Sequence, residues 1–345
     1  MNKVNKKSIL ITGGAGFIGS NFIPLFVEKY EDYNIINLDL LTYAGDLSNL
    51  QEIENHPRYK FIQGDICDRP LIESIFGEFD IMGVIHFAAE SHVDNSIKKP
   101  EIFIQTNVTG SWTLLDVAYK YWLDAPFKYK EKYKNCRFHN ISTDEVYGSL
   151  GSSGLFTEKT AYAPNSPYSA AKASVDMFVR AYNETYGLDV IITNCSNNYG
   201  PKQHSEKLIP TIIRKALNGE SIPIYGDGKN IRDWLYVLDH CKAIDLVYHN
   251  GKTANIYNIG GKNERTNLQI VDRICTILDD KVPQQNGKSY KDLITFVEDR
   301  AGHDRRYAID ATKLENDLGW SADEDFDSGI LKTVDWYLSK YANLK

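Results

Sequence analysis

Short apolar runs rich in β-branched residues alternate with longer segments of helical period along the first part of the chain. The runs cover residues 8–12, 34–38, 60–63, 83–87, 137–142 and 190–195. Such alternation is typical of parallel strands joined by right-handed helical crossovers. We therefore expect an α/β fold with a doubly wound parallel sheet that binds its ligands at the carboxyl ends of the strands.

The alternation loosens after about Asn197, where turn-rich pieces separate helical patterns. Two of these pieces are Tyr225-Gly226-Asp227-Gly228 and Asn258-Ile259-Gly260-Gly261. We expect residues 1–196 to form the main domain and residues 197–345 to form mainly a smaller mixed α/β lobe. The sequence leaves open whether the chain crosses back between the two. One helix should begin near Thr266 with Asn267 as its cap, and another should cover 329–337.

Charge and composition exclude several classes of partner. The net charge of -7 over 345 residues argues against nucleic acid, which requires a basic surface to neutralise its phosphates. No apolar run approaches the roughly 20 residues that span a bilayer, and no hydrophobic leader precedes the first run, so we expect a cytoplasmic protein. The 5 cysteines include no C-x-x-C pair, which predicts reduced buried thiols and no metal site.

The first apolar run leads into a glycine-rich turn, Gly13-Gly14-Ala15-Gly16-Phe17-Ile18-Gly19. Glycines at every third position permit a tight turn, close approach of backbone N–H groups to a pyrophosphate, and close packing of helix on strand. Asp39 ends the next run, where a carboxylate can bond the adenosine ribose and would repel a 2′-phosphate. The pattern predicts a Rossmann-like domain that binds NAD rather than NADP, although such a turn with purely local bonds remains the alternative.

Two further strand ends add candidate cofactor contacts. Asp65-Ile66 follows the third run and could reach the adenine edge, or Asp65 could cap a turn. Ala88-Ala89 follows the fourth run, where small side chains would let a dinucleotide lie against the backbone. A tightly packed strand-helix junction would explain the same alanines.

Tyr168 and Lys172 lie four residues apart on one face of a helix introduced by Pro164 and Pro167. A tyrosine is a poor base at neutral pH, but a nearby ammonium and a positive nicotinamide ring would favour its phenolate. The pair is therefore a candidate base for a sugar hydroxyl, and Lys172 could also hold the nicotinamide ribose. A surface pair on an amphipathic helix is the alternative.

The fifth run delivers Thr143-Asp144-Glu145 to the carboxyl edge of the predicted sheet. Two adjacent carboxyl groups can supply an acid and a base when their pKa values are pushed apart. Thr143 could hydrogen-bond the reacting hydroxyl. An aspartate that caps a turn beside a solvated glutamate is the alternative.

Together these motifs resemble the extended short-chain dehydrogenase/reductase family, and within it the members that dehydrate nucleotide sugars. The likeness covers nearly the whole chain, apart from the insert 124–135 and the loop 148–156. Besides the motifs above, it rests on Ala88 to Asp94, Asn194 to Pro201, Ile231 to Val237 and Arg300 to Tyr307.

The resemblance implies a reaction on dTDP-glucose that yields dTDP-4-keto-6-deoxyglucose, a step of deoxysugar biosynthesis such as that of dTDP-rhamnose. Tyr168 would remove the O4 proton while the C4 hydride passes to NAD. Glu145 would then take the C5 proton as Asp144 protonates the C6 hydroxyl that leaves as water. Return of the hydride to C6 would regenerate a tightly bound NAD in each cycle.

The resemblance also implies the substrate contacts and the assembly. The expected substrate-binding residues are Ser91, Asn197, Asn198, Lys207, Leu208, Tyr225, Arg232, Asn267, Arg300 and His303. Arginine suits a diphosphate because its planar fork donates paired hydrogen bonds. A homodimer is expected, in which the helices 105–121 and 168–186 form a four-helix bundle with those of the partner.

Three other functions compete with this one. A nucleotide-sugar 4-epimerase would share the glycine turn, Thr143, Tyr168 and Lys172 but needs no C5 base, so Asp144 and Glu145 argue against it. UDP-glucose could replace dTDP-glucose, although Gly302 to Tyr307 favours dTDP. An NAD sensor without chemistry would not need all four of the acid, base, tyrosine and lysine groups.

Overall fold

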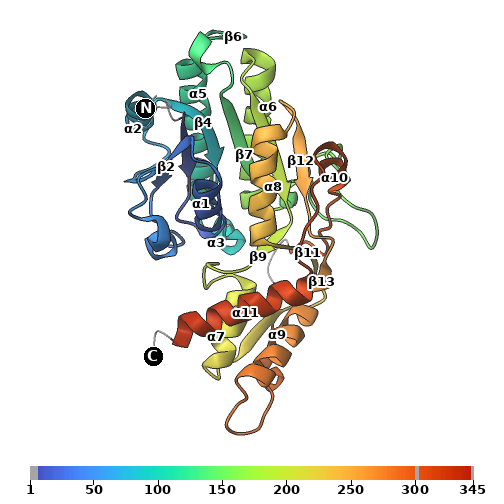
Figure 1. Cartoon of the computed structure of the whole chain (residues 1–345). Helices are drawn as coiled ribbons and strands as arrows, with labels where there is room; N and C mark the ends of the chain where they lie inside the picture. Colours follow the sequence, from blue (N-terminus) through green and yellow to red (C-terminus); the bar gives the residue numbers. More distant parts are fainter. Residues whose placement is uncertain (1–6, 300–302, 343–345) are drawn as a thin grey trace.

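The computed structural model describes residues 7–299 and 303–342. Its centre is a seven-stranded sheet in the order β12-β8-β7-β4-β1-β2-β3, in which every pairing is parallel (Figure 1). This confirms the predicted fold, and all six predicted runs are strands. The strands are β1 (Lys7–Thr12), β2 (Tyr33–Asp39), β3 (Tyr59–Gln63), β4 (Ile81–His86), β7 (Arg137–Thr143), β8 (Val190–Cys195) and β12 (Ile256–Ile259).

Helices cover both faces of the sheet, because successive side chains of each strand point to opposite sides. On β1, Leu10 faces a core shared by α2 (Arg69–Phe79), α5 (Ser111–Trp122) and α6 (Pro167–Tyr186). Ile9 and Ile11 face the other core, to which α1 (Phe17–Lys29) and α8 (Val237–Asn250) contribute. The order of strands reverses between β1 and β4, which opens a ligand crevice at their carboxyl ends.

The seventh strand corrects one sequence expectation. Asn258 and Ile259, expected in a turn-rich piece of the smaller lobe, end β12, which pairs with β8 from Ile256↔Ile192 to Ile259↔Cys195. The polar residue in this strand is buried and hydrogen-bonded: Asn258 Oδ1 accepts from Tyr147 Oη at 2.8 Å, and its Nδ2 donates to the Phe156 carbonyl at 3.1 Å. The short run resembled a turn because Gly260 and Gly261 follow it directly.

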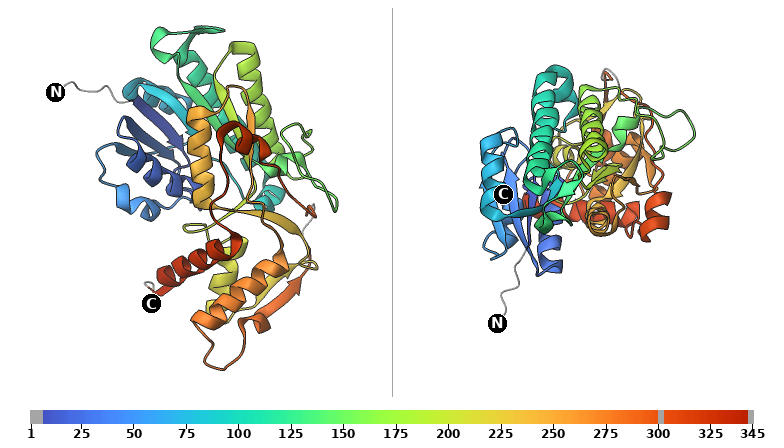
Figure 2. Two further views of the ribbon diagram at one scale, coloured as in Figure 1. Left: turned by 45° about the vertical axis from the view of Figure 1, so that its right-hand side comes forward. Right: turned by 90° about the horizontal axis from the view of Figure 1, so that it is seen from above.

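A smaller group of elements lies beyond the carboxyl edge of the sheet and has its own apolar core (Figures 1 and 2). It contains β9 (Asn197–Tyr199), α7 (Leu208–Leu217), β10 (Ile222–Tyr225), β11 (Ile231–Tyr236), β13 (Glu264–Thr266), α9 (Asn267–Lys281), β14 (Ile294–Val297) and α11 (Phe326–Ala342). In contrast, α8, β12 and α10 (Thr312–Leu318) share a core with β8. The chain therefore crosses between the two groups more than once.

The predicted cap of α9 was wrong by one residue. Thr266, not Asn267, is the N-cap: its hydroxyl accepts from the Gln269 N–H at 3.2 Å, and the Gln269 side chain accepts from the Thr266 N–H at 2.8 Å. This reciprocal pair satisfies two amide groups at the helix start, whereas Asn267 is already helical. The predicted helix 329–337 lies inside α11.

The segment between β4 and β7 is mainly helical. It comprises α3 (Val93–Lys98), α4 (Pro100–Phe103), the π-helical turn η2 (Ile104–Gly110) and α5, followed by a hairpin of β5 (Leu123–Ala125) and β6 (Lys128–Tyr129) and the 3-10 turn η3 (Glu131–Tyr133). The helix expected over 105–121 is thus α5 and the π-helical turn before it. Three further 3-10 turns are η1 (Leu47–Ile53), η4 (Asp144–Tyr147) and η5 (Tyr290–Leu293).

No helix within the described ranges has the length and apolarity needed to cross a bilayer. The cysteines are free thiols, four of them buried, and Cys67 is partly exposed.

Candidate active site

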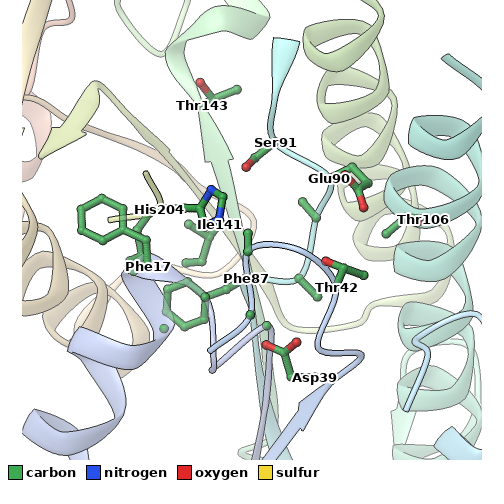
Figure 3. Close-up of a pocket in the computed structure, with 18 of the residues that line it drawn as sticks. Phe17, Asp39, Thr42, Phe87, Glu90, Ser91, Thr106, Ile141, Thr143 and His204 are labelled. Carbon is green, nitrogen blue, oxygen red and sulfur yellow. The ribbon is translucent and has the colours of Figure 1, made fainter. Parts of the chain in front are cut away.

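A cavity of about 450 Å³ opens at the carboxyl ends of β1, β2, β4, β7 and β8 (Figure 3). It is also lined by residues that follow β8, from Ser196 to Lys207, so both groups of elements contribute to its wall. Of the predicted site residues it is lined by Gly13, Gly16, Phe17, Ile18, Gly19, Asp39, Asp65, Ile66, Ala88, Ala89, Ser91, Thr143, Glu145, Tyr168, Lys172, Asn197, Asn198 and Lys207.

The glycine turn forms one wall, and its shape requires glycine. Gly13 has a φ of +72, and a Cβ there would lie 2.6 Å from the Cα of Ala88. A Cβ on Gly19 would lie 2.6 Å from the Gly13 carbonyl oxygen. With Gly16, Phe17 and Ile18 in the lining, the amino end of α1 opens into the cavity, as binding of an anionic pyrophosphate requires. The residues present therefore fit a dinucleotide.

Replacing Gly13 by alanine should destabilise the fold and the cofactor site together. Strain at positive φ costs about 1–3 kcal/mol, and the backbone clash adds to it. We expect a lower midpoint of thermal unfolding and less NAD in the purified protein. Gly77→Ala in α2 is the matched control, since a Cβ there meets no atom within 4 Å. Equal NAD content in the two variants would contradict this account of the turn.

Asp39 lines the cavity, but its carboxylate also holds the turn (Figure 3). Oδ2 accepts from the Ala15 N–H at 2.9 Å, and Oδ1 accepts from the Leu41 N–H at 2.9 Å. Burial raises the pKa of Asp39, and these two bonds oppose the shift. The local bonds named above as an alternative are therefore present, although each oxygen retains a lone pair for a ribose hydroxyl.

The Asp65 carboxylate, like that of Asp39, accepts a local backbone hydrogen bond and also lines the cavity. Its Oδ1 accepts from the Cys67 N–H at 2.8 Å, which is the turn cap considered from the sequence, while the residue also lines the cavity. The backbone of Ala88 lies against Gly13, so this segment packs on the glycine turn as well as lining the cavity.

The carboxyl end of β7 places two adjacent acids in different surroundings. Thr143 ends the strand, and its Oγ1 accepts from the Glu145 N–H at 3.3 Å, which starts η4. Asp144 is only 2% exposed, and its Oδ2 has no hydrogen-bond partner among the described residues. Burial, together with the charges of Glu145 and Asp233, holds the pKa of Asp144 well above its usual range. Glu145 instead faces the cavity.

The helix α6 brings Tyr168 and Lys172 to the same cavity. Ser166 and Ser169 form a capping box at its start, and Pro167 occupies the first helical position. Lys172 is 4% exposed, and its ammonium donates to the Ile141 carbonyl at 2.6 Å. Tyr168 is hydrogen-bonded to Thr143.

The surroundings of Tyr168 correct the expected effect of Lys172. Burial first, and then the charge of Glu145, raise the pKa of Tyr168 well above its usual value, and the bond to Thr143 only partly opposes them. The charge of Lys172 alone is not enough to offset the cost of burying a phenolate. The neutral phenol of Tyr168 is therefore favoured.

Of the remaining predicted substrate contacts, those within the described residues do not line the cavity. Arg232 is buried 4.2 Å from the centre of the Tyr307 ring and donates to the Asp304 carbonyl at 2.9 Å, and its charge lowers the pKa of Asp144. Tyr225 and His303 lie together, with ring centres 6.4 Å apart. Asn267 and Leu208 begin α9 and α7, and Arg300 lies outside the described residues.

Several lining residues carried no sequence signal. They come from loops and from the π-helical turn, where neither strand nor helix period says which side chains point inward. The polar ones include Thr42, Thr106, Gln203, His204 and Glu206, of which Thr42, Thr106 and His204 are labelled in Figure 3. No cluster of three or more potential metal ligands occurs in the described part of the chain.

The sequence matches the family model described as GDP-mannose 4,6 dehydratase over residues 10–333. It is 52% identical over 341 residues to the dTDP-glucose 4,6-dehydratase of Neisseria gonorrhoeae, covering 98% of this chain and 97% of that protein. It is 53% identical over 340 residues to that of Escherichia coli, covering 96% and 92%.

Among solved structures, the dTDP-glucose 4,6-dehydratase of Bacillus anthracis in complex with NAD superposes with a TM-score of 0.84 at 47% identity, covering 97% of this chain and 98% of that chain. The UDP-glucose 4-epimerase of Thermotoga maritima has the same TM-score at 28% identity, covering 97% and 99%. The two classes of enzyme share this fold, and sequence identity separates them.

Proposed function

This chain belongs to the dTDP-glucose 4,6-dehydratase family, and we propose that it converts dTDP-glucose to dTDP-4-keto-6-deoxyglucose for deoxysugar biosynthesis. The observation that carries the proposal is that Glu145 lines the cavity together with Tyr168, while the adjacent Asp144 is buried behind the lining, near enough for its charge to raise the pKa of Tyr168. A 4-epimerase moves hydrogen at C4 alone and has no use for an acid and a base at C6 and C5. The buried acid and the cavity-facing carboxylate suit elimination of water.

The glycine turn, Asp39 and Lys172 would hold NAD, because they line one continuous cavity. When bound, NAD supplies the oxidant for C4 and returns the same two electrons to C6, so the sugar undergoes no net oxidation. The carboxylate of Asp39 disfavours an added 2′-phosphate by charge repulsion.

Three side chains move protons on the sugar. Tyr168, which is hydrogen-bonded to Thr143, takes the O4 proton directly, and a positively charged nicotinamide ring, when bound, would offset the carboxylates that raise the pKa of Tyr168. Glu145 takes the C5 proton once C4 is a ketone. Asp144, kept protonated by burial, donates its proton to the departing C6 hydroxyl, which leaves as water.

The substrate contacts follow the site's geometry. Asn197 and Asn198 on β9 and Ser91 after β4 line the cavity where the sugar would lie. Asn197 Oδ1 is buried and has no hydrogen-bond partner among the described residues, so it is available to a sugar hydroxyl. Arg232, Tyr225 and His303 lie outside this lining, and the family resemblance alone assigns Arg232 to the diphosphate and Tyr225 with His303 to the base.

A homodimer through α5 and α6 completes the proposal. Apolar side chains are exposed on α6 and on the helices before it, and they reach 60% exposure at Ile104. They are Ile97, Ile102, Ile104, Trp112, Met177 and Phe178. Because α3, α4, α5 and the π-helical turn all pack against α6, these side chains lie on neighbouring elements, and we propose that a second copy covers them in a four-helix bundle.

Phe178→Glu should weaken this dimer, since it places a charge in an apolar interface. Sedimentation of the purified protein should give a dimeric mass, and the variant should shift towards the monomer. Leu331→Glu, at a similarly exposed leucine on α11, is the control. A monomeric parent protein would refute the assembly.

The function itself is tested by turnover without added NAD. Purified protein should convert dTDP-glucose to a product with the alkali-induced absorbance of a 4-keto-6-deoxy sugar. A preference for UDP-glucose would change only the nucleotide assigned to the substrate. Epimerised hexose without a keto product would overturn the roles of Asp144 and Glu145.

A further inference from the structure

One buried carboxylate, that of Asp176 on α6, has no part in the chemistry above. It is 0% exposed. Its Oδ1 accepts from Asn140 Nδ2 at 2.8 Å, and its Oδ2 accepts from Ser142 Oγ at 2.8 Å and from Tyr162 Oη at 3.0 Å. Three donors satisfy an ionised carboxylate, whereas a buried anion without partners would be costly.

These donors place Asp176 between the two elements that carry the catalytic groups. Asn140 and Ser142 alternate on β7, so both point to the same face of the sheet. On α6, Asp176 follows Lys172 by one helical turn, as Lys172 follows Tyr168. One carboxylate therefore joins the strand that ends at Thr143 to the helix that presents the tyrosine and lysine.

The other titratable groups around Lys172 and Asp176 are driven to their neutral forms by burial. Burial lowers the pKa of His86 on β4 to about 3 and raises that of Cys195 on β8 to about 12. It also raises the pKa of the neighbouring tyrosines, which are Tyr147, Tyr162 and Tyr168. Asp176 itself differs from these neighbours. Burial raises the pKa of Asp176 only to about 6, because Lys172 and the three donors oppose the shift.

We propose that Asp176 is a positioning residue, one helical turn from Lys172, that keeps charged the ammonium which donates to the Ile141 carbonyl beside the cofactor cavity. This inference deepens the proposed function and rests on it. Burial alone lowers the pKa of Lys172, and the charge of Asp176 opposes that shift. Without its counter-ion, Lys172 would lose its proton at lower pH, and a neutral amine would neither stabilise a phenolate nor bind a ribose as strongly.

Asp176→Asn tests the proposal in the NAD-loaded protein. The amide has nearly the same shape, and the hydroxyls of Ser142 and Tyr162 can turn to accept from it. The pKa of Lys172, followed by ¹³C NMR of lysine labelled at Cε, should fall by about one to two units. The alkaline limb of the turnover profile should move to lower pH by the same amount, because activity is lost as Lys172 deprotonates.

Tyr162→Phe is the matched control, because it removes one donor to Asp176 but leaves the carboxylate charged. It should lower thermal stability while the Lys172 titration stays near that of the parent protein. If Asp176→Asn also left that titration unchanged, Asp176 would have only a packing role. The NMR titration does not require turnover, so failure of this inference can be told apart from failure of the proposed function.

A measurement on the unsubstituted protein covers the case in which Asp176→Asn does not fold. The Lys172 Cε resonance should shift as Asp176 ionises, between about pH 5 and pH 7. A resonance that stays constant over this range would show that the two groups are not coupled and would overturn the proposal.

Discussion

Tyr168→Phe should lower turnover of dTDP-glucose by about 10²- to 10⁴-fold, the usual contribution of a positioned general base. The ring would still fill its place beside Thr143, but no group would remain to take the O4 proton. The block falls on the first oxidation, so mixing the variant with excess substrate should produce no absorbance from NADH. Both turnover and this absorbance can be followed on one sample.

The matched control is Tyr186→Phe at the far end of the same helix. Its ring stacks on Tyr119 at 4.5 Å, and phenylalanine preserves that contact. Turnover of the control should match the parent protein. Rapid formation of NADH by Tyr168→Phe would remove Tyr168 from the role of O4 base.

Glu145→Gln should slow product formation by a comparable factor, about 10²- to 10⁴-fold, but at a later step. The amide keeps the shape of the side chain and cannot accept the C5 proton. Because Tyr168 remains, C4 oxidation should proceed, and NADH should accumulate where the parent protein shows little. The loss of one negative charge should also lower the pKa of Tyr168, which Glu145 raises.

Exchange at C5 gives the decisive measurement for this variant. In deuterated water, the parent protein should incorporate deuterium at C5 of the recovered sugar, and Glu145→Gln should not. Glu184→Gln, an exposed position on α6, serves as the control and should behave as the parent does. Unchanged turnover of Glu145→Gln would show that another group is the C5 base.

Six of the seven strands of the main sheet were predictable because each contains a short run rich in apolar and β-branched residues. Burial on both faces of a parallel sheet demands such runs, so the pattern is visible without knowledge of neighbours. The glycine turn was predictable for a similar reason: the positive φ at Gly13 and the close contact with Ala88 leave no room for another residue type. These requirements act on neighbouring residues, so they are visible in the sequence.

The seventh strand was missed because it is only four residues long and runs directly into Gly260 and Gly261, a pair typical of a turn, and because its polar residue finds its partners far away in the chain. Asn258 is bonded to Tyr147 and Phe156, more than a hundred residues earlier in the chain. Likewise, no local sequence pattern could show that the Asp39 carboxylate accepts a hydrogen bond from the Ala15 N–H and also faces the cavity. Partners this far apart are brought together only by the packed fold.

Six strands of the sheet, the glycine turn and the predicted catalytic residue types can be inferred from the sequence, because backbone geometry and apolar burial act on near neighbours. How those residue types differ in chemistry depends on the packed tertiary structure. Asp144 and Glu145 are adjacent in the chain, yet one is buried and kept protonated while the other faces the cavity. The charge on Lys172 likewise depends on Asp176 and on how deeply both are buried, and burial exists only once the chain has folded.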